Sequence, residues 1–279
     1  LKIRGAQNWQ YQVDVLDKLE TAYHQGLPIH FDSYPYDTTW QVLYSYLPKW
    51  AIEGGRKTML KQFRDAIQRN NILTYLGNLE TDIKSLVIAS TANRLNVNGK
   101  TLATIAKDME ISSEAALLEL IEKGGGEVLV FDQNLSQELV ETFIAHPLCI
   151  PASDGGGFSL QGRSRTNRDK LVHPRCFGTT AKTFTLLQNH GHNLEQAIKK
   201  LSSDPASLMG LSKRGQISIG NYADLVILNE VLFSDRATLT NPYKPALGIE
   251  HVIVNGKPVV QNSTVTGKTS GIFLKKETI

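Results

Sequence analysis

RGQISIGNYADLVIL, residues 214–228, says more about the architecture than any other part of the chain. The alternating apolar residues at its start predict a short strand, and the Gly-Asn pair at 220–221 predicts a turn. The apolar run that follows predicts a buried strand, and Asp224 stands where the chain enters it. Further on, Asn255-Gly256 separates two apolar segments, which is a type I′ hairpin signal. The last part of the chain is therefore predicted to be a small β module.

The segments ahead of this module alternate between helix and strand signals. Residues 12–25 carry apolar side chains at helical spacing, and a strand signal follows at residues 29–33. A second strand is predicted at residues 148–153, with Asp154 at its carboxyl end. Catalytic residues of β/α barrels lie at such strand ends, so Asp154 is a candidate site residue. Helices are also predicted at residues 179–190, 194–201 and 203–209.

Residues 37–146 depart from this alternation and are too long for a plain loop. They carry apolar patterns of their own, which predict helices at 57–69, 101–109, 114–123 and 137–145 and strands at 85–89 and 127–131. We therefore expect an α/β insert subdomain in this part of the chain.

Composition excludes several classes of protein. The 279 residues are 41% hydrophobic and 20% charged, which suits one large or two modest domains. Thirty basic against 27 acidic residues give a net charge of +3 without a basic stripe, so no nucleic-acid partner is expected. Two cysteines allow neither a disulfide framework nor a CxxC zinc pattern. No apolar run reaches the ~20 residues of a membrane helix, so we expect no membrane partner and a cytoplasmic location.

Six segments in matching order resemble the N-acyl-D-amino-acid deacylases (D-aminoacylases), a branch of the amidohydrolase superfamily. They are DSYPY at 32–36, LPKWAIEGG at 47–55, GKTLATIA at 99–106, SDG at 153–155, HPRCFGT at 173–179 and the stretch at 214–228. The resemblance implies an α/β fold: a partial TIM-type (β/α) barrel formed by its last strands, with an α/β insert and C-terminal β-sandwich strands. It divides the chain into late barrel units (1–36), the insert (37–146), the last barrel strand and helices (147–209) and the sandwich portion (210–279).

The resemblance also implies zinc-dependent hydrolysis of the amide bond of N-acyl-D-amino acids, which releases a carboxylate and a D-amino acid. Asp154 matches the family's aspartate that takes the proton of the attacking water and passes it to the leaving amine. Without the resemblance, an aspartate before glycines is an ordinary turn residue.

Three further residues match substrate-binding positions of the family. Arg175 matches the arginine that binds the substrate carboxylate, and a guanidinium suits this task because it forms two parallel bonds. Lys2 and Tyr34 match positions near the same carboxylate. The alternatives are a solvated terminus for Lys2 and a packed ring for Tyr34.

Other residues that could bind a metal or substrate are interpreted as structural residues or weaker candidates. His190-Gly191-His192 has the form of a metal-binding HxH, yet it falls between two predicted helices and is interpreted as a connector. His30 is interpreted as an interior histidine, and His173 as a turn or packing residue. Tyr36 is a weaker candidate than Tyr34.

No metal ligand of the family falls within this chain, because the matching positions would precede Leu1. We therefore expect a C-terminal portion that binds zinc through ligands upstream of Leu1 and that is inactive without its N-terminal half as partner. The basic residues Arg163, Arg165 and Arg168 favour an acidic substrate such as N-acyl-D-glutamate or N-acyl-D-aspartate. The alternatives are another amidohydrolase, such as a cyclic amidase, and a non-catalytic remnant that acts as an interaction module.

Overall fold

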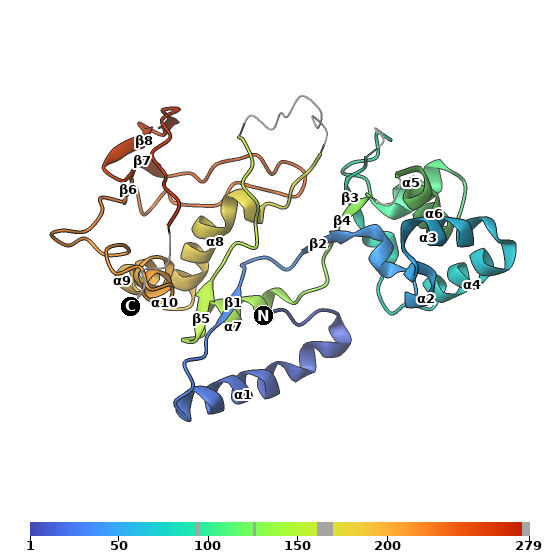
Figure 1. Cartoon of the computed structure of the whole chain (residues 1–279), viewed down its shortest axis with the longest axis horizontal. Coiled ribbons are helices and arrows are strands. Elements are labelled where there is room, and N and C mark those ends of the chain that lie inside the picture. Colours follow the sequence, from blue (N-terminus) through green and yellow to red (C-terminus); the bar gives the residue numbers. More distant parts are fainter. Residues whose placement is uncertain (93–94, 125–126, 161–169, 275–279) are drawn as a thin grey trace.

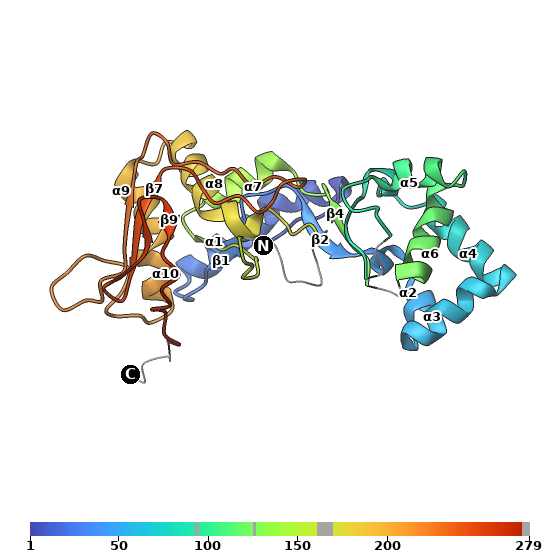
Figure 2. The ribbon, with the colours of Figure 1, turned by 90° about the horizontal axis from the view of Figure 1, so that it is seen from above.

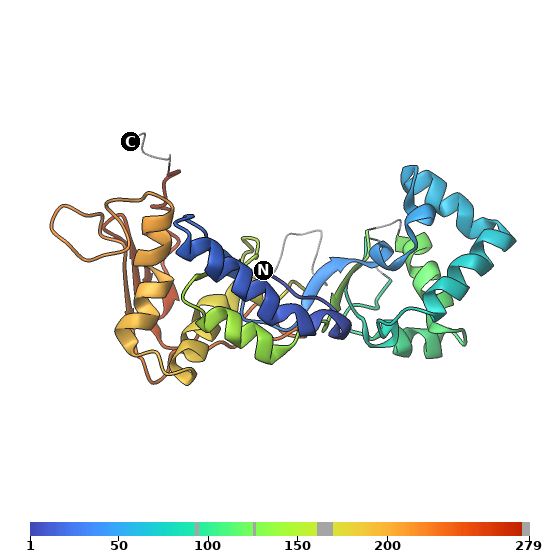
Figure 3. The same cartoon turned by 90° about the horizontal axis from the view of Figure 1, so that it is seen from below.

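A computed structural model describes residues 1–92, 95–124, 127–160 and 170–274 of the chain. The molecule is elongated, with a helical lobe at one end, a β-sheet region at the other and the N-terminus between them (Figure 1). The two turned views show the same separation (Figures 2 and 3).

The central part is organised around two short parallel strands, β1 (Phe31–Ser33) and β5 (Cys149–Pro151). Their parallel pairing brings both carboxyl ends to the same edge, so the residues after β1 and after β5 emerge side by side. Five helices accompany the pair: α1 (Gln12–His24), α7 (Gln137–Ala145), α8 (Arg175–Asn189), α9 (Leu194–Leu201) and α10 (Ser203–Leu208). A short 3-10 turn, Ala6–Tyr11, precedes α1.

The core of the central part lies between the strands, α7 and α8. Ile144, Cys149 and Phe184 are fully buried there. Burial raises the pKa of the Cys149 thiol to about 12, so this cysteine is a neutral core residue. Helix α7 packs against β1, β5 and α8, and its buried side chains belong to this core.

The insert lobe, residues 39–132, contains a three-stranded antiparallel sheet in the order β2 (Thr39–Val42), β4 (Leu129–Asp132), β3 (Val87–Ser90). Its helices are α2 (Lys49–Ile52), α3 (Gly55–Arg64), α4 (Ala66–Gly77), α5 (Leu102–Asp108) and α6 (Ser113–Gly124), with 3-10 turns at Leu43–Tyr46 and Ile83–Ser85. A separate cluster of buried apolar side chains fills the lobe.

The C-terminal sheet consists of β6 (Leu225–Leu228), β7 (Ile249–Val254), β8 (Lys257–Gln261) and β9 (Thr264–Val265), paired antiparallel in that order. Asn255 and Gly256 have φ values of 49° and 75°, as a type I′ turn requires. The hairpin prediction is therefore confirmed.

Helix predictions with a capping residue agree best with the structure. α7 and α9 have the predicted bounds, and each is capped by the side chain just before it, Ser136 and Asn193. The helix predicted at 57–69 is instead divided into α3 and α4, because the Asp65 side chain accepts from the amides of Ile67 and Gln68 and starts a new helix.

Three predictions are wrong. Residues 214–219 form no strand, and the Ile217 and Ile219 side chains are 91% and 104% exposed. This segment folds into a loop because Arg214 pairs with Asp224 and lies over the Tyr222 ring instead of entering a ladder.

The strand after that turn, β6, is also less buried than predicted, since Val226 is 54% exposed. His30 is exposed rather than interior, because it precedes β1 and its ring faces Tyr23 at 6.4 Å between ring centroids.

The architecture is a mixed α/β fold, and the parallel strands that the structure describes form one pair rather than a closed barrel. The four-part division of the chain stays a prediction. Within the described residues no helix has the length and apolar character needed to cross a membrane.

Candidate active site

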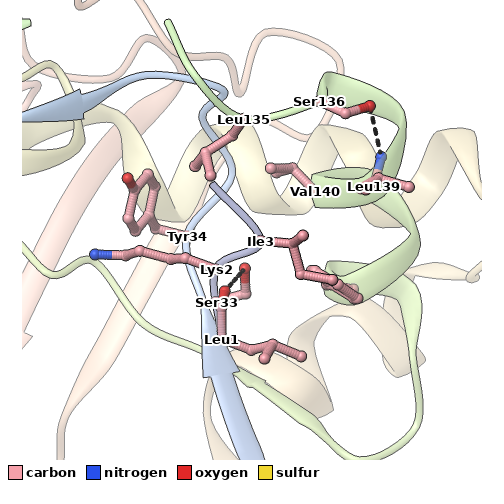
Figure 4. A pocket seen from close by; sticks show the side chains of 10 residues that line it. Leu1, Lys2, Ile3, Ser33, Tyr34, Leu135, Ser136, Leu139 and Val140 are labelled. Carbon is pink, nitrogen blue, oxygen red and sulfur yellow. Dashed lines mark hydrogen bonds between the residues drawn. The ribbon is translucent and has the colours of Figure 1, made fainter. Parts of the chain in front are cut away.

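Lys2 lies in an extended segment beside β1. Its side chain reaches the edge of the sheet at which β1 and β5 have their carboxyl ends. The Ser33 Oγ donates to the Leu1 carbonyl at 3.5 Å and links this segment to the strand. Figure 4 shows the alternation of the segment: Leu1 and Ile3 point toward α7, and the Lys2 side chain points the other way, past Tyr34. The alternation explains why a lysine here meets the residues that follow β5.

Asp154 lies three residues beyond β5, in a turn that glycine makes possible. Its φ of 47° is in the left-handed region, which aspartate tolerates better than most residues. The Gly155 amide donates to the Ser153 Oγ at 3.1 Å. A Cβ at Gly155 would lie 3.0 Å from the Cys176 Cα and 3.2 Å from the Arg175 carbonyl oxygen. Because Gly155 has no side chain, the turn can approach the start of α8 closely.

This approach places the Asp154 carboxylate between two cations. Its Oδ2 accepts from the Lys2 Nζ at 2.7 Å and lies 3.2 Å from the Arg175 Nη1. Partial burial acts to raise the pKa of Asp154, but the Lys2 hydrogen bond and the charges of Arg175 and Lys2 outweigh it. The pKa of Asp154 is consequently below its ordinary value, and the carboxyl is ionised at neutral pH.

The Tyr34 ring lies beneath the charged groups of both Lys2 and Arg175. The Lys2 Nζ lies 4.7 Å and the Arg175 guanidinium carbon 4.9 Å from the centroid of its ring. The ring is 2% exposed, and its hydroxyl donates to the Thr38 carbonyl at 3.0 Å. Burial raises the pKa of Tyr34 to about 12, so it stays protonated and orients the cations rather than transferring a proton. We call Lys2, Tyr34, Asp154 and Arg175 the Asp154 cluster.

Arg175 is the least exposed cation of the cluster, with 8% of its side chain accessible. It is the first residue of α8, where the helix dipole disfavours a positive charge and favours an anion. Its buried Nε has no hydrogen-bond partner within the described part of the chain. The position therefore favours a second anion, since a carboxylate can bind Nε and Nη together.

The structure also shows contacts that the sequence did not indicate. His173 is fully buried, and its ring nitrogens contact the Arg175 amide and the Thr38 carbonyl. Tyr36 donates to the Asp235 Oδ2 at 2.7 Å, away from the Asp154 cluster. His-Pro directly before a helix start is the one sequence signal that could have drawn attention to His173.

The remaining candidates lie apart from the cluster. His190 directly follows α8, and its Nε2 lies 3.2 Å from the Oε2 of Glu141 in α7. The three basic residues that suggested an acidic substrate, Arg163, Arg165 and Arg168, lie outside the described residues.

The Asp154 cluster does not fit a metal ion by itself. Its single carboxylate is already paired with two cations, which repel a metal. Across the described ranges of the chain, no three His, Cys, Asp or Glu side chains are grouped so that they hold a metal.

Comparison with known proteins finds similar sequences and a similar solved fold. Residues 178–260 match the model of the amidohydrolase family. The N-acyl-D-glutamate deacylase of Alcaligenes xylosoxydans xylosoxydans is 24% identical over 98% of this chain and 46% of its own length. The D-aminoacylase of the same organism is 34% identical over 43% of this chain and 25% of its own length.

A solved structure has the same fold. It is the N-acyl-D-glutamate deacylase from Bordetella bronchiseptica complexed with zinc and a phosphonate inhibitor, with 22% identity and a TM-score of 0.68. The match covers 92% of this chain and 45% of that protein, so the chain spans about half the length of these two N-acyl-D-glutamate deacylases. Together these matches show that residues 178–260 are similar to the amidohydrolase family and that the chain is similar to the D-aminoacylases and other N-acyl-D-amino-acid deacylases.

Proposed function

We propose that the Asp154 cluster is part of the active site of a metal-assisted N-acyl-D-amino-acid deacylase. The observation that carries the proposal is the meeting of Lys2 and Arg175 on one carboxylate, above the Tyr34 ring and beyond the end of β5. These groups come from separate segments of the chain, and a strand end is where α/β enzymes gather their catalytic residues.

In the proposed site, Lys2 and Arg175 bind the carboxylate of the substrate. Arg175 supports this role because its Nε has no hydrogen-bond partner among the described residues, and Nε–H and the neighbouring Nη2–H are a parallel pair of donors that suits a carboxylate. Lys2 supports it because its side chain is 36% exposed and can follow an incoming anion while it stays over Tyr34. The Tyr34 ring limits where both cations can lie, which orients the bound substrate.

Asp154 moves the proton in the proposed reaction. Its carboxylate accepts a proton from water as the water oxygen bonds to the acyl carbon. The C–N bond then breaks, and the leaving nitrogen takes that proton, so Asp154 returns to its ionised form. The products are a carboxylic acid, which passes its remaining proton to the amine or to water and becomes a carboxylate, and a D-amino acid.

Substrate binding also makes Asp154 a better base. With its cations paired to Asp154, the carboxyl has a lowered pKa and a weak affinity for protons. A substrate carboxylate that binds Lys2 and Arg175 withdraws those partners and adds a negative charge nearby. Both changes raise the pKa of Asp154 toward the neutral range in which general bases act best.

Zinc belongs to the proposal through the relatives, one of which was solved with it. The described residues do not form a site for it, and no step above is derived through a metal. We propose that the metal ligands lie in the portion of the relatives that this chain does not cover.

The test is hydrolysis by the protein expressed with whatever its reading frame encodes before Leu1. With zinc supplied, we expect release of the amino acid from N-acetyl-D-leucine or N-acetyl-D-glutamate but not from the L enantiomers. Asp154→Asn is expected to lower kcat by about 10²–10⁴, the usual contribution of a general base. A glutamate preference would support the acidic substrate that Arg163, Arg165 and Arg168 suggested.

Asp108→Asn is the matched control, because Asp108 is also half exposed and is paired with a lysine, at 2.8 Å, on the insert lobe. Equal activity of the Asp154→Asn variant and the wild type would show that the assignment is wrong.

A non-catalytic interaction module is the second candidate. The observation that favours it is the set of exposed apolar side chains of the C-terminal part, which includes Ile217, Ile219 and Val231 at 91%, 104% and 93% exposure. Stable binding of a partner protein without any zinc-supported hydrolysis would favour this function over the deacylase.

A further inference from the structure

We propose that His173 is a positioning residue that fixes the Arg175 guanidinium for binding of the substrate carboxylate. The inference rests on the carboxylate-binding role proposed above for Arg175. It adds a residue that contacts neither the substrate nor Asp154 and that acts through the backbone of Arg175.

Hydrogen bonding defines a single tautomer of His173. The Arg175 backbone N–H donates to the His173 Nδ1 at 3.1 Å, so this nitrogen carries no proton. The proton is therefore on Nε2, which donates to the Thr38 carbonyl at 2.9 Å. One imidazole thus joins the start of α8 to the segment between β1 and β2.

The surroundings keep the ring neutral and in place. It is 0% exposed and is enclosed by aromatic rings in edge-to-face arrangements, with centroids 6.0 Å away at Tyr34, 5.4 Å at Tyr36 and 5.7 Å at Phe131. Burial, and then the charge of Arg175, lower the pKa of His173 to about 3. Its hydrogen-bond pattern is accordingly constant across the physiological range.

These contacts determine the position of Arg175 at both of its ends. The bond to Nδ1 fixes the backbone from which the side chain starts, at the first residue of α8. The contact with Tyr34 fixes the ring over which the guanidinium lies. A shift of the imidazole therefore moves the origin and the support of the guanidinium together.

The two hydrogen bonds of His173 can be removed separately. His173→Asn keeps an acceptor close to the Nδ1 position, so it can preserve the bond from the Arg175 amide. His173→Gln places its amide nitrogen close to the Nε2 position, so it can preserve the bond to Thr38 and loses the one to Arg175. If His173 had a purely structural role, both variants would lose carboxylate affinity to the same extent.

The experiment compares the affinities of N-acetyl-D-leucine and N-acetyl-D-leucinamide, which lacks the carboxylate, by calorimetry. We expect the wild type to bind N-acetyl-D-leucine more tightly than N-acetyl-D-leucinamide. The affinity of the Asn variant for N-acetyl-D-leucine is expected to stay within about threefold of the wild-type value, a difference of less than 1 kcal/mol. The Gln variant is expected to lose about tenfold in carboxylate affinity, the usual net worth of one hydrogen bond. Equal affinities of the two variants, whether both preserved or both lost, would overturn the proposal.

A second readout separates this inference from the proposed function. Amide hydrogen exchange at Arg175 is expected to be faster than in wild type in the Gln variant and not in the Asn variant, whether or not any ligand binds. Absence of a carboxylate preference in wild type would refute the proposed binding role, and the exchange data would still test the positioning by His173. If the Gln variant does not fold, ¹⁵N NMR of wild-type His173 decides, since a proton on Nδ1 excludes the Arg175 bond.

Discussion

The insert lobe and the C-terminal sheet differ in how their apolar side chains are covered. In the lobe, Ile88, Leu117 and Ile121 are completely buried in a cluster drawn from both helices and strands. In the C-terminal sheet, β6 leaves Val226 and Ile227 54% and 49% exposed. The lobe therefore has a core of its own, whereas the sheet gains little from burial of its strands within the described part of the chain.

Removal of a core side chain is the strongest test of this contrast. Leu117→Ala in the lobe is expected to lower the free energy of unfolding by about 2–5 kcal/mol, because it leaves a cavity in a close-packed core. Val226→Ala in β6 is expected to change it by less than about 0.5 kcal/mol, as for most exposed positions. Urea unfolding of both variants measures the difference, and equal losses would contradict the contrast.

The same contrast explains which parts of the fold could be predicted from the sequence. Helices with local caps and apolar spacing, such as α7 and α9, form as predicted because their signals lie within a few residues. The strand predicted at residues 214–219 failed because a strand also needs a partner, and its alternating isoleucines find none among the described residues. Pattern alone does not report such long-range pairing.

Removal of one arginine charge, either in the Asp154 cluster or in the insert lobe, tests which of the two regions binds the substrate carboxylate. Arg175→Gln is expected to weaken binding of N-acetyl-D-leucine by about 10- to 100-fold, the range of a charge-assisted hydrogen bond. Arg69→Gln is the control, because Arg69 is also partly buried and lies 3.6 Å from Glu119 in the lobe. Calorimetric titration measures both, and an equal effect of the two variants would show that Arg175 has no special role in anion binding.

The candidate site could be predicted only in part. Its four residues were named by resemblance to a family, and the structure brings them together, although their roles stay proposals. The contacts of His173 and the close approach at Gly155 were not predicted, because both depend on segments far apart in the chain.

A methyl group at Gly155 tests that close approach. Gly155→Ala places a Cβ against the backbone of Arg175 and Cys176, at the 3.2 and 3.0 Å separations given above. We expect a loss of about 1–3 kcal/mol in stability, as for overpacking, and weaker carboxylate binding as Asp154 moves away from Arg175. Gly157→Ala is the control in the same turn, because a Cβ there meets no atom of the described residues within 4 Å. Thermal unfolding and titration with N-acetyl-D-leucine distinguish the two variants, and similar results for both would mean that the turn adapts.

The smallest expected effect is on the titration of Asp154. Its pKa is lowered, so its contribution to stability is present above the ordinary aspartate pKa of about 3.9 and is lost as the pH falls through the folded-state value. Lys2→Met removes the hydrogen bond to Oδ2 and is expected to raise the pKa of Asp154 toward the ordinary value, so that less stability is lost on acidification. The effect is small because the carboxylate is 51% exposed and solvent screens the pair. ¹³C NMR of the Asp154 carboxyl measures the shift, with Lys100→Met on the insert lobe as the control that leaves it unchanged. An unchanged titration in the Lys2→Met variant would show that Arg175 alone holds the carboxylate in its ionised form.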